Sequence, residues 1–311
     1  MKNVFMHPDQ MAALVAVADT GSFDRAASCL GVSTSAVSQR IRALESGLGR
    51  VLLRRGAPST VTETGATVLR YARQQQLLAG EMTTELGLEA EAGDPGGQGE
   101  GPVELPVAVN EDSLATWFPA VFTEAARWSD VRLRLVAAHE GRTAELLRDG
   151  GVMAAVSAGS GPVAGCRSEP LGEVSYLPVA VPALLEGVGL EGDGDRGAPG
   201  GERERARLSR LPVLRFDAVD DLEDLVLEAS GLPLGLPGPN VPGAEAYTQA
   251  LLAGMGWGLL TRSQAARNPG LVAVPGLVPV VRELTWYRWR LRSVLLDRLT
   301  DAVHRAFGTS A

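Results

Sequence analysis

Lysine is almost missing from this 311-residue chain, and histidine and cysteine are scarce. Arginine supplies all but one of the 29 basic residues, and the single lysine is Lys2. Enzymes that form a Schiff base with pyridoxal phosphate, or that hold nucleotide phosphates in a P-loop, need an interior lysine, so both classes are excluded. Histidine occurs only at His7, His139 and His304, which leaves histidine-based acid/base catalysis few positions.

The two cysteines and the hydropathy pattern exclude further classes. Cys29 and Cys166 have no neighbouring Cys or His at metal-ligand spacing, so we expect neither a disulfide framework nor a metal site and interpret both as buried thiols. No apolar run is long enough to cross a bilayer, and the N-terminus has no basic and then apolar leader. We therefore expect a cytoplasmic protein without a membrane partner, without a cofactor and without enzymatic activity.

Charge is distributed unevenly along the chain. Residues 1–80 hold 9 Lys+Arg against 5 Asp+Glu, a net charge of +4, whereas residues 81–311 hold 20 against 32, a net charge of -12. A basic N-terminal part joined to an acidic body predicts that the basic part binds a polyanion. The length also exceeds what one core usually serves, which is about 250 to 300 residues, so we expect two or three folding units.

Three helices are predicted near the N-terminus, and a tight turn separates the short second and third. The first helix is expected before Gly21. Ser22 then begins a second helix that ends at Gly31, and Ser33 caps a third that runs to about Leu44. A glycine-containing turn between two short helices is typical of a helix-turn-helix, whose second helix enters the DNA major groove.

The third helix has a polar face suited to base recognition. Gln can pair with adenine, Arg with guanine, and hydroxyls with base edges or phosphates. Any solvated helix also has a polar face, but the turn and the local positive charge favour DNA. The predicted DNA contacts on this helix are Ser33, Thr34, Ser35, Ser38, Gln39 and Arg42.

A hairpin and a long helix are predicted next. Residues 50–62 resemble a small wing, in which Arg54 and Arg55 would contact phosphates or the minor groove. Thr62 then caps a helix to about Leu88. Residues at a spacing of about 3.5 along this helix predict pairing with a second copy. They are Val68, Ala72, Gln75, Leu78, Met82 and Glu85.

The remainder of the chain predicts a hinge and an α/β body. Residues 89–102 are acidic and glycine-rich, which is typical of a hinge. Beyond them short apolar runs alternate with helical patterns, and this alternation indicates parallel sheets flanked by helices. A second glycine- and charge-rich tract, 186–209, predicts a disordered surface insert.

The order of these parts resembles the LysR-type transcriptional regulators. GSFDRAASCLGVSTSAVSQRIRALESGLGRVLLRR from Gly21, followed by TETG from Thr62, is similar to the DNA-binding block of that family. In the body, NEDSLATWFPAVF, PVAGC, LPVLRF and GMGWGLL resemble the lysine/arginine-export regulator (LysG/ArgP) group. The resemblance implies an α/β protein with an N-terminal all-α winged helix-turn-helix, a linker helix and a C-terminal effector domain of two α/β subdomains like those of periplasmic binding proteins.

The same resemblance implies domain bounds and a function. The expected domains are a winged helix-turn-helix at 1–62, a linker and dimerisation helix at 63–88, a hinge at 89–102, and an effector-binding domain at 103–311, with subdomain one at 104–178 and 277–311 and subdomain two at 179–276. The expected function is that of a homodimeric or homotetrameric transcriptional activator that binds double-stranded promoter DNA and has RNA polymerase as a further partner. The regulator is expected to sense lysine or arginine and to control an amino-acid exporter gene. The alternatives are a regulator of another small-molecule pathway, and an architectural or replication-control DNA-binding protein without a basic amino-acid effector.

A site for a basic amino acid needs hydrogen-bond donors for the ligand carboxylate at one end and carboxylates for the cationic side chain toward the other. Ser113 is expected to begin a helix directly after a strand, where backbone N–H groups bind a carboxylate, or only to cap that helix. Asp112, Glu140 and Asp217 lie at or just past strand ends, where ligands collect in open α/β sheets. Of these, Asp217 is the favoured partner of a ligand ammonium.

Four further residues are candidates for the effector site. His139 is either a ligand contact or a structural hydrogen bonder. Trp117 either walls the cleft or belongs to the core. Where relatives of the LysG/ArgP group have VPSAE, this chain has Gly243 in place of the serine, so at Gly243 and Ala244 only the backbone is left to contact a ligand.

Overall fold

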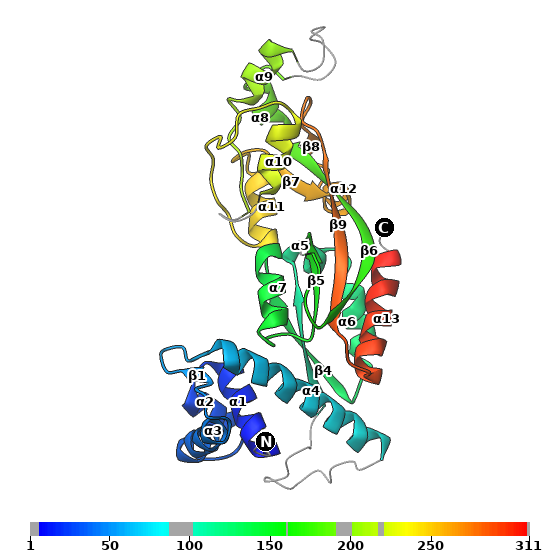
Figure 1. Ribbon diagram of the computed structural model, residues 1–311. Coiled ribbons are helices and arrows are strands. Elements are labelled where there is room, and N and C mark those ends of the chain that lie inside the picture. Colours follow the sequence, from blue (N-terminus) through cyan, green and yellow to red (C-terminus); the bar gives the residue numbers. More distant parts are fainter. Residues whose placement is uncertain (1–5, 87–101, 160, 191–200, 217–220, 310–311) are drawn as a thin grey trace. The chain divides into compact units, whose positions relative to one another are not determined.

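The computed structural model describes residues 6–86, 102–159, 161–190, 201–216 and 221–309 (Figure 1). The chain forms two compact units. Unit 1 comprises Met1–Val109, Ala120–Glu169 and Thr285–Ala306, and unit 2 comprises Asn110–Pro119, Pro170–Leu284 and Phe307–Ala311. The chain therefore passes between the units repeatedly, and the finer division into hinge and subdomains stays a prediction.

The first three helices of unit 1 share a core of their own. They are α1 (Pro8–Thr20), α2 (Phe23–Cys29) and α3 (Thr34–Leu48). The chain leaves α1 at Gly21 with φ of 64°, and a Cβ at this position would lie 2.8 Å from Pro58 Cβ, so both the conformation and the space require glycine. The side chains of Ser22 and Ser33 accept hydrogen bonds from backbone N–H groups three residues on, which confirms them as the caps of α2 and α3.

The predicted wing and long helix follow. The wing is a two-stranded antiparallel hairpin of β1 (Leu53–Arg54) and β2 (Thr60–Val61), and with α1 to α3 it forms the head, residues 8–62. Thr62 caps α4 (Glu63–Glu85) by accepting a hydrogen bond from Gly65 N at 2.9 Å. A Cβ on Gly65 would lie 2.0 Å from the Leu52 carbonyl oxygen, so α4 begins in direct contact with the backbone before the wing.

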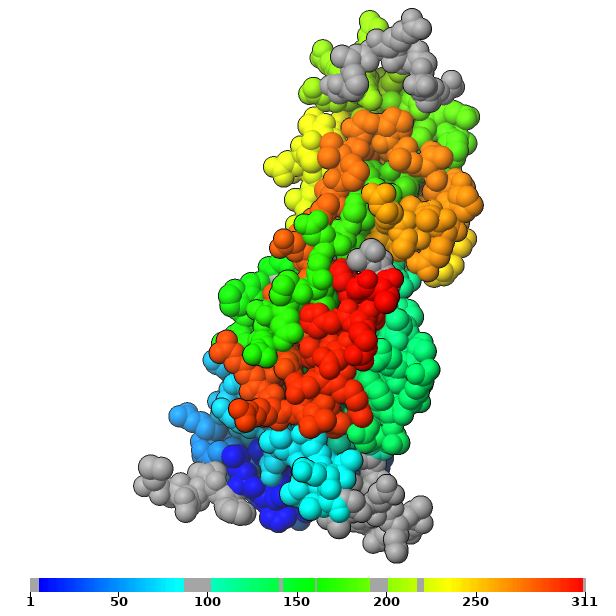
Figure 2. All heavy atoms as spheres, turned by 90° about the vertical axis from the view of Figure 1, so that its right-hand side faces the viewer, coloured from blue at the N-terminus to red at the C-terminus, as the bar shows by residue number. Residues whose placement is uncertain are grey.

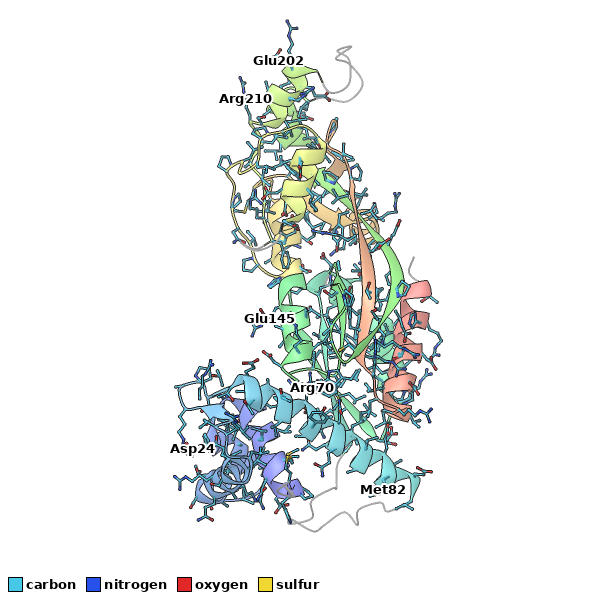
Figure 3. All side chains as sticks on the ribbon, in the orientation of Figure 1. Asp24, Arg70, Met82, Glu145, Glu202 and Arg210 are labelled. Atoms are coloured by element: carbon cyan, nitrogen blue, oxygen red, sulfur yellow. The ribbon has the colours of Figure 1, made fainter. Side chains whose placement is uncertain are left out.

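The predicted pairing of α4 with a second copy is wrong for the first two residues of the proposed set. Val68 and Ala72 are buried in the core of the head, so neither can meet a second copy. These two residues are buried because α4 packs against the head. The spacing of residues along a single helix does not reveal such a contact. The large apolar side chains exposed along α4 and at its C-cap are Tyr71, Leu78, Met82 and Leu86, of which Met82 is labelled in Figure 3.

The rest of unit 1 is a sheet covered by helices. β3 (Val103–Val109) lies between β4 (Val131–Ala137) and β5 (Ala154–Ala158) and is parallel to both, which confirms the predicted parallel pairing for these three strands but not for the antiparallel strands of unit 2. β9 (Val280–Trp289) follows β5 in the strand order. The helices are α6 (Pro119–Ala125), α7 (Glu140–Arg148) and α13 (Val294–Gly308).

An ion pair joins the last helix to α6. Arg305 on α13 donates a hydrogen bond to a carboxylate oxygen of Glu124 on α6 at 2.7 Å. In Figure 2, α13 is the red segment and lies beside the teal segment that contains α6. The hydrogen bond from Arg305 lowers the pKa of the Glu124 carboxyl, and the pair is exposed, so it contributes little to stability.

Unit 2 is built around antiparallel strands. β6 (Cys166–Ala180) pairs with β7 (Gly258–Thr261) and with β8 (Val272–Ala273). Trp257, which is 1% exposed, lies in an apolar cluster of this unit. The helices of unit 2 are α5 (Glu111–Ala115), α8 (Pro182–Glu186), α9 (Glu202–Leu208), α10 (Leu222–Ala229), α11 (Ala244–Leu252) and α12 (Arg262–Arg267).

Two expectations about the interior and the surface are wrong. Within the tract expected to be a disordered insert, Glu202–Leu208 form α9, because Leu208 is buried in the core of unit 2 and anchors the helix; residues 191–200 lie outside the described residues. Cys29 is exposed rather than buried, whereas Cys166 is buried, and this burial raises the pKa of its thiol to about 11. None of the described helices is long and apolar enough to cross a membrane.

Candidate functional site

Helix α3 buries one face and exposes the other. Val37, Ile41 and Leu44 are at most 2% exposed and belong to the core of the head. Because residues three and four apart share a face of a helix, these contacts fix the rotation of α3 about its axis. The opposite surface carries the predicted DNA contacts: Ser33, Thr34, Ser35, Gln39 and Arg42 are exposed, and Ser38 is half-buried.

Two of the predicted DNA contacts also hold the head together. The Ser33 hydroxyl accepts a hydrogen bond from Ala36 N at 3.2 Å, and the Thr34 hydroxyl donates to Asp24 Oδ1 at 2.8 Å. Asp24 lies on α2 (labelled in Figure 3), so Thr34 links α2 to the start of α3. These hydroxyls therefore set the geometry of the turn as well as facing solvent.

The wing adds positive charge beside this face. Arg54 is exposed at the end of β1, and the Arg55 guanidinium lies 5.5 Å from the centroid of the Phe23 ring. Stacking of this kind restricts the arginine side chain without removing its charge. Arg50, which the sequence argument did not name, is exposed just after α3 and adds a third guanidinium near the wing. Such a surface suits DNA phosphates.

Residues that contact base edges and residues that contact phosphates should respond differently to substitution. Gln39→Ala should narrow the difference in affinity between a selected duplex and random DNA, because a base-edge contact is worth about 1 to 3 kcal/mol of discrimination. Arg55→Ala should weaken binding to both duplexes alike and reduce the slope of log affinity against log salt by about 1. Fluorescence anisotropy at several salt concentrations measures both effects. Equal losses on both duplexes for Gln39→Ala would contradict the groove assignment.

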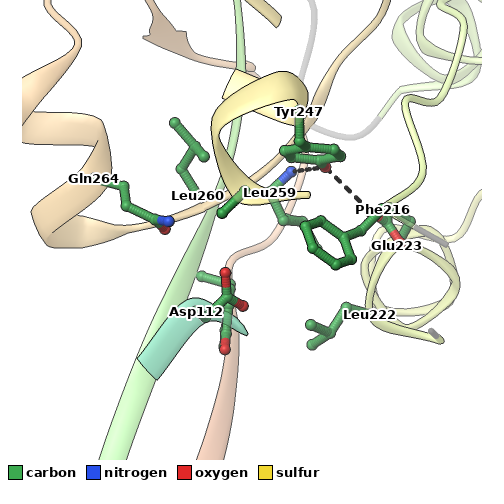
Figure 4. Close-up of a pocket in the computed structure, with 10 residues that line it drawn as sticks. Asp112, Phe216, Leu222, Glu223, Tyr247, Leu259, Leu260 and Gln264 are labelled. Atoms are coloured by element: carbon green, nitrogen blue, oxygen red, sulfur yellow. Dashed lines mark hydrogen bonds between the residues drawn. The ribbon is translucent and has the colours of Figure 1, made fainter. Parts of the chain in front are cut away.

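A small pocket in unit 2 holds two carboxylates among aromatic rings (Figure 4). Asp112 comes from α5 and Glu223 from α10. The empty space around these lining residues, open solvent included, is about 330 Å³. The other lining residues are Tyr176, Phe216, Leu222, Ala244, Tyr247, Leu259, Leu260 and Gln264.

The Tyr247 hydroxyl organises one wall of this pocket. It accepts a hydrogen bond from Leu259 N at 2.8 Å, and its one proton faces two acceptors, the Leu214 carbonyl oxygen at 3.1 Å and Glu223 Oε1 at 3.2 Å. The ring can approach this closely because residue 258 is glycine, where a Cβ would lie 2.2 Å from the hydroxyl. Burial raises the pKa of Tyr247, and the negative charges of Glu223 and Asp112 raise it further, so the phenol keeps its proton.

Glu223 is the main residue of this pocket that the sequence argument missed. It is 2% exposed, and it lies on the face of α10 that also buries Leu222, Val226 and Leu227. The signal was a carboxylate at a position where the helical periodicity requires an apolar residue. A charge in such a position is costly unless it has partners, so it marks a site.

The chemistry of the pocket favours a cation. Two carboxylates can form charge-assisted hydrogen bonds with a guanidinium or an ammonium, and the faces of Phe216 and Tyr247 attract the same positive charge. Their ring centroids lie 5.6 Å apart. Across the described ranges, no three His, Cys, Asp or Glu side chains are grouped as metal ligands.

The structure brings together only some of the residues predicted for the effector site. Asp112 and Ala244 line the pocket. Gly243 precedes Ala244 as the N-cap of α11, with φ of 89°, a conformation that favours glycine. Asp217, the favoured partner for a ligand ammonium, lies outside the described residues.

Ser113 differs from the sequence expectation, whereas Trp117 follows its core alternative. α5 begins at Glu111 after the N-cap Asn110, so Ser113 does not begin the helix, and this expectation was wrong by two residues. The Ser113 hydroxyl is buried and accepts a hydrogen bond from Trp117 Nε1 at 3.0 Å. Trp117 is 4% exposed and packs edge-on against Phe307. It does not line the carboxylate pocket but a second cavity of unit 2.

His139 and Glu140 belong to unit 1, whereas the residues of the carboxylate pocket all belong to unit 2. His139 is the N-cap of α7, and its carbonyl oxygen accepts hydrogen bonds from the Thr143 N–H and hydroxyl, both at 3.2 Å. Glu140 is the first residue of α7, and its side chain lies outside the described atoms. A contact of either residue with an effector stays a prediction.

Two family models match the chain. The model of the bacterial regulatory helix-turn-helix protein, lysR family, matches residues 8–66, and the model of the LysR substrate binding domain matches residues 99–308. The first match covers the head and the start of α4. The second covers the α/β parts of both units.

Relatives and solved structures are similar over nearly the whole chain. The lysine export transcriptional regulatory protein LysG of Corynebacterium efficiens is 41% identical over 302 residues, which are 96% of this chain and 97% of that protein. The crystal structure of ArgP from Mycobacterium tuberculosis has a TM-score of 0.78 at 36% identity and covers 97% of both chains. Full-length LysG from Corynebacterium glutamicum with bound effector Arg has a TM-score of 0.69 at 38% identity, over 98% of this chain and 99% of that one.

Proposed function

The chain belongs to the LysR family of bacterial helix-turn-helix regulators, and we propose that its carboxylate pocket in unit 2 binds arginine, lysine or a related basic amino acid. In this proposal the regulator binds promoter DNA through α3 and the wing. It assembles into a homodimer or homotetramer in the cytoplasm, controls an amino-acid exporter gene and performs no covalent chemistry. The relatives named above are transcriptional regulators, which supports this reading.

The pairing of Asp112 with Glu223 in one pocket carries the proposal. The ligand guanidinium or ammonium lies between these carboxylates and against the rings of Phe216 and Tyr247. Backbone N–H groups in the first turn of α11, after Gly243, are suited to the ligand carboxylate, because the start of a helix attracts anions. The arginine bound to LysG of Corynebacterium glutamicum supports the same ligand class.

Calorimetric titration of the full chain tests the ligand. Arginine and citrulline have nearly the same shape but differ in the charge of the terminal group. Arginine or lysine should give saturable heats, and citrulline should bind at least about 30-fold more weakly than arginine, since a buried charge left without its partner costs about 2 kcal/mol or more. Citrulline binding as tightly as arginine would contradict the cation site. No heat from any basic amino acid would favour a DNA-binding protein without such an effector.

A further inference from the structure

A second and larger cavity in unit 2 borders the carboxylate pocket along α5, β6, β7 and α12. Its empty space, open solvent included, is about 1320 Å³, compared with about 330 Å³ for the carboxylate pocket. We propose that it binds an organic carboxylate that carries an apolar group, and that this binding is coupled to the carboxylate pocket.

The apolar part of the cavity is built from buried rings. Trp117 and Phe307 are 4% and 7% exposed, and their rings meet edge-on with centroids 5.3 Å apart. The Trp117 indole is held in place because its N–H donates to Ser113 Oγ at 3.0 Å. Val174 of β6 is a third apolar residue of the cavity lining. A fixed aromatic wall of this kind suits a flat or branched apolar group.

The charged part of the cavity has the opposite sign to the carboxylate pocket. Arg262 and Arg267, both exposed on α12, supply two guanidinium groups, and Glu173 supplies one carboxylate. Arg267 Nε donates to the Ser263 carbonyl oxygen at 3.2 Å, which holds this side chain along its helix. Among the described residues neither arginine has an ion-pair partner. The two guanidinium groups and the hydroxyl of Ser175, which line the same cavity, are groups suited to a carboxylate of the ligand.

The two sites share their walls. α5 and its C-cap place Asp112 in the pocket and Thr116 in the cavity, and the Thr116 hydroxyl donates to the Asp112 carbonyl oxygen at 2.6 Å. On β6, the neighbouring residues Tyr176 and Ser175 line the pocket and the cavity respectively.

Helix α12 provides the third shared wall. Gln264 lines the carboxylate pocket, and its side-chain oxygen accepts hydrogen bonds from both the N–H and the hydroxyl of Thr261, each at 2.8 Å. Thr261 itself lines the cavity, next to Arg262. A ligand that moves α12 or the α5 C-cap therefore shifts groups that line the other site, and such coupling is reciprocal.

Binding of 3-phenylpropanoate to the full chain tests the ligand class. Two matched probes accompany it: 3-phenylpropanamide lacks the charge, and acetate lacks the ring. We expect saturable calorimetric heats for 3-phenylpropanoate, with binding at least about tenfold tighter than that of either matched probe, since hydrogen bonds to charged groups are among the stronger ones. Equal binding of the amide and the carboxylate would overturn the proposed ligand class.

Two substitutions on α12 locate the site. Ala266→Trp, at an exposed position that lines the cavity, should obstruct part of it and weaken binding of 3-phenylpropanoate. Arg267→Gln should weaken that binding at least about tenfold. Arg210→Gln, which removes an exposed arginine of unit 2 outside the cavity (labelled in Figure 3), is the matched control and should bind the probe as the wild type does. Unchanged binding in both α12 variants would overturn the site.

Sedimentation tests whether the cavity is instead a contact between copies of the chain. That assignment follows if the wild type does not bind the probe and Ala266→Trp changes the oligomeric state.

The coupling is tested by titrating arginine with and without saturating 3-phenylpropanoate. The arginine Kd should change at least about fivefold, and the Kd of 3-phenylpropanoate should change by the same factor when arginine is saturating. An unchanged arginine Kd would overturn the coupling. The coupling rests on the proposed function, but the cavity does not: if 3-phenylpropanoate binds and arginine gives no heat, the effector proposal fails while the second site stands.

Discussion

Replacing Glu223 by glutamine should weaken arginine binding by about 30-fold or more. The substitution keeps the size of the side chain, and its oxygen can still accept the hydrogen bond from Tyr247, which in the wild type spans 3.2 Å. What is lost is a negative charge on a side chain that is 2% exposed, where water screens it little. Truncating one partner of a buried charge pair costs about 2 to 5 kcal/mol, which sets the size of the effect.

A matched control exists on the same helix. Glu228 is exposed on α10, so Glu228→Gln removes the same charge without touching the pocket and should leave the arginine Kd within about twofold of the wild type. Calorimetry on the three proteins decides between the outcomes. The discrimination between arginine and citrulline should also shrink in Glu223→Gln alone. Wild-type affinity in Glu223→Gln would remove this residue from the cation site.

The substitution Asp19→Ala should cost the protein about 3 kcal/mol of unfolding free energy. Asp19 on α1 accepts hydrogen bonds from Arg73 of α4 and from Arg134 of β4, the latter at 3.0 Å. The Arg73 side chain is only 4% exposed, and its Nε donates to the Gly150 carbonyl oxygen at 2.6 Å. Removing Asp19 leaves a buried guanidinium without its counter-ion, a change that costs about 3 to 5 kcal/mol when both partners are buried. Asp19 is 22% exposed, which places the expected value at the lower end.

Glu104→Ala is the comparison for this prediction. Glu104 pairs with the same Arg134 at 2.7 Å, but its side chain is 42% exposed, so its loss should cost less than about 1 kcal/mol. Urea unfolding followed by far-UV circular dichroism gives both values. Equal losses of unfolding free energy in the two variants would show that the burial of Arg73 does not determine the cost of removing Asp19.

The head was predictable because its signals are local. Ser22, Ser33 and Thr62 act on N–H groups three residues away, so their role can be inferred from a few neighbouring residues. The parallel strands β3, β4 and β5 followed from the alternation of apolar runs and helical patterns. The predicted pairing of α4 with a second copy failed at Val68 and Ala72 because the head occupies that face of the helix, and this depends on tertiary packing.

The carboxylate pocket was predictable only in part. Asp112 was found because ligands collect at strand ends, a rule that needs only the order of elements. Glu223 and Tyr247 come from helices that the sequence places far from α5, and only the fold brings them to one pocket. Ser113 was misplaced because the start of α5 depends on the backbone of Asn110, which leaves the strand in an extended conformation and caps the helix.

DNA footprinting with and without arginine tests the central claim, which is that a cation in the carboxylate pocket changes how the head binds DNA. The substrate is a duplex selected by the protein from a random library. In the wild type we expect a footprint whose extent or affinity changes on addition of arginine, because a ligand that distinguishes two states shifts their populations. In Glu223→Gln we expect a much smaller change. A footprint that saturating arginine leaves unaltered, or no protection at low ionic strength, would contradict the central claim.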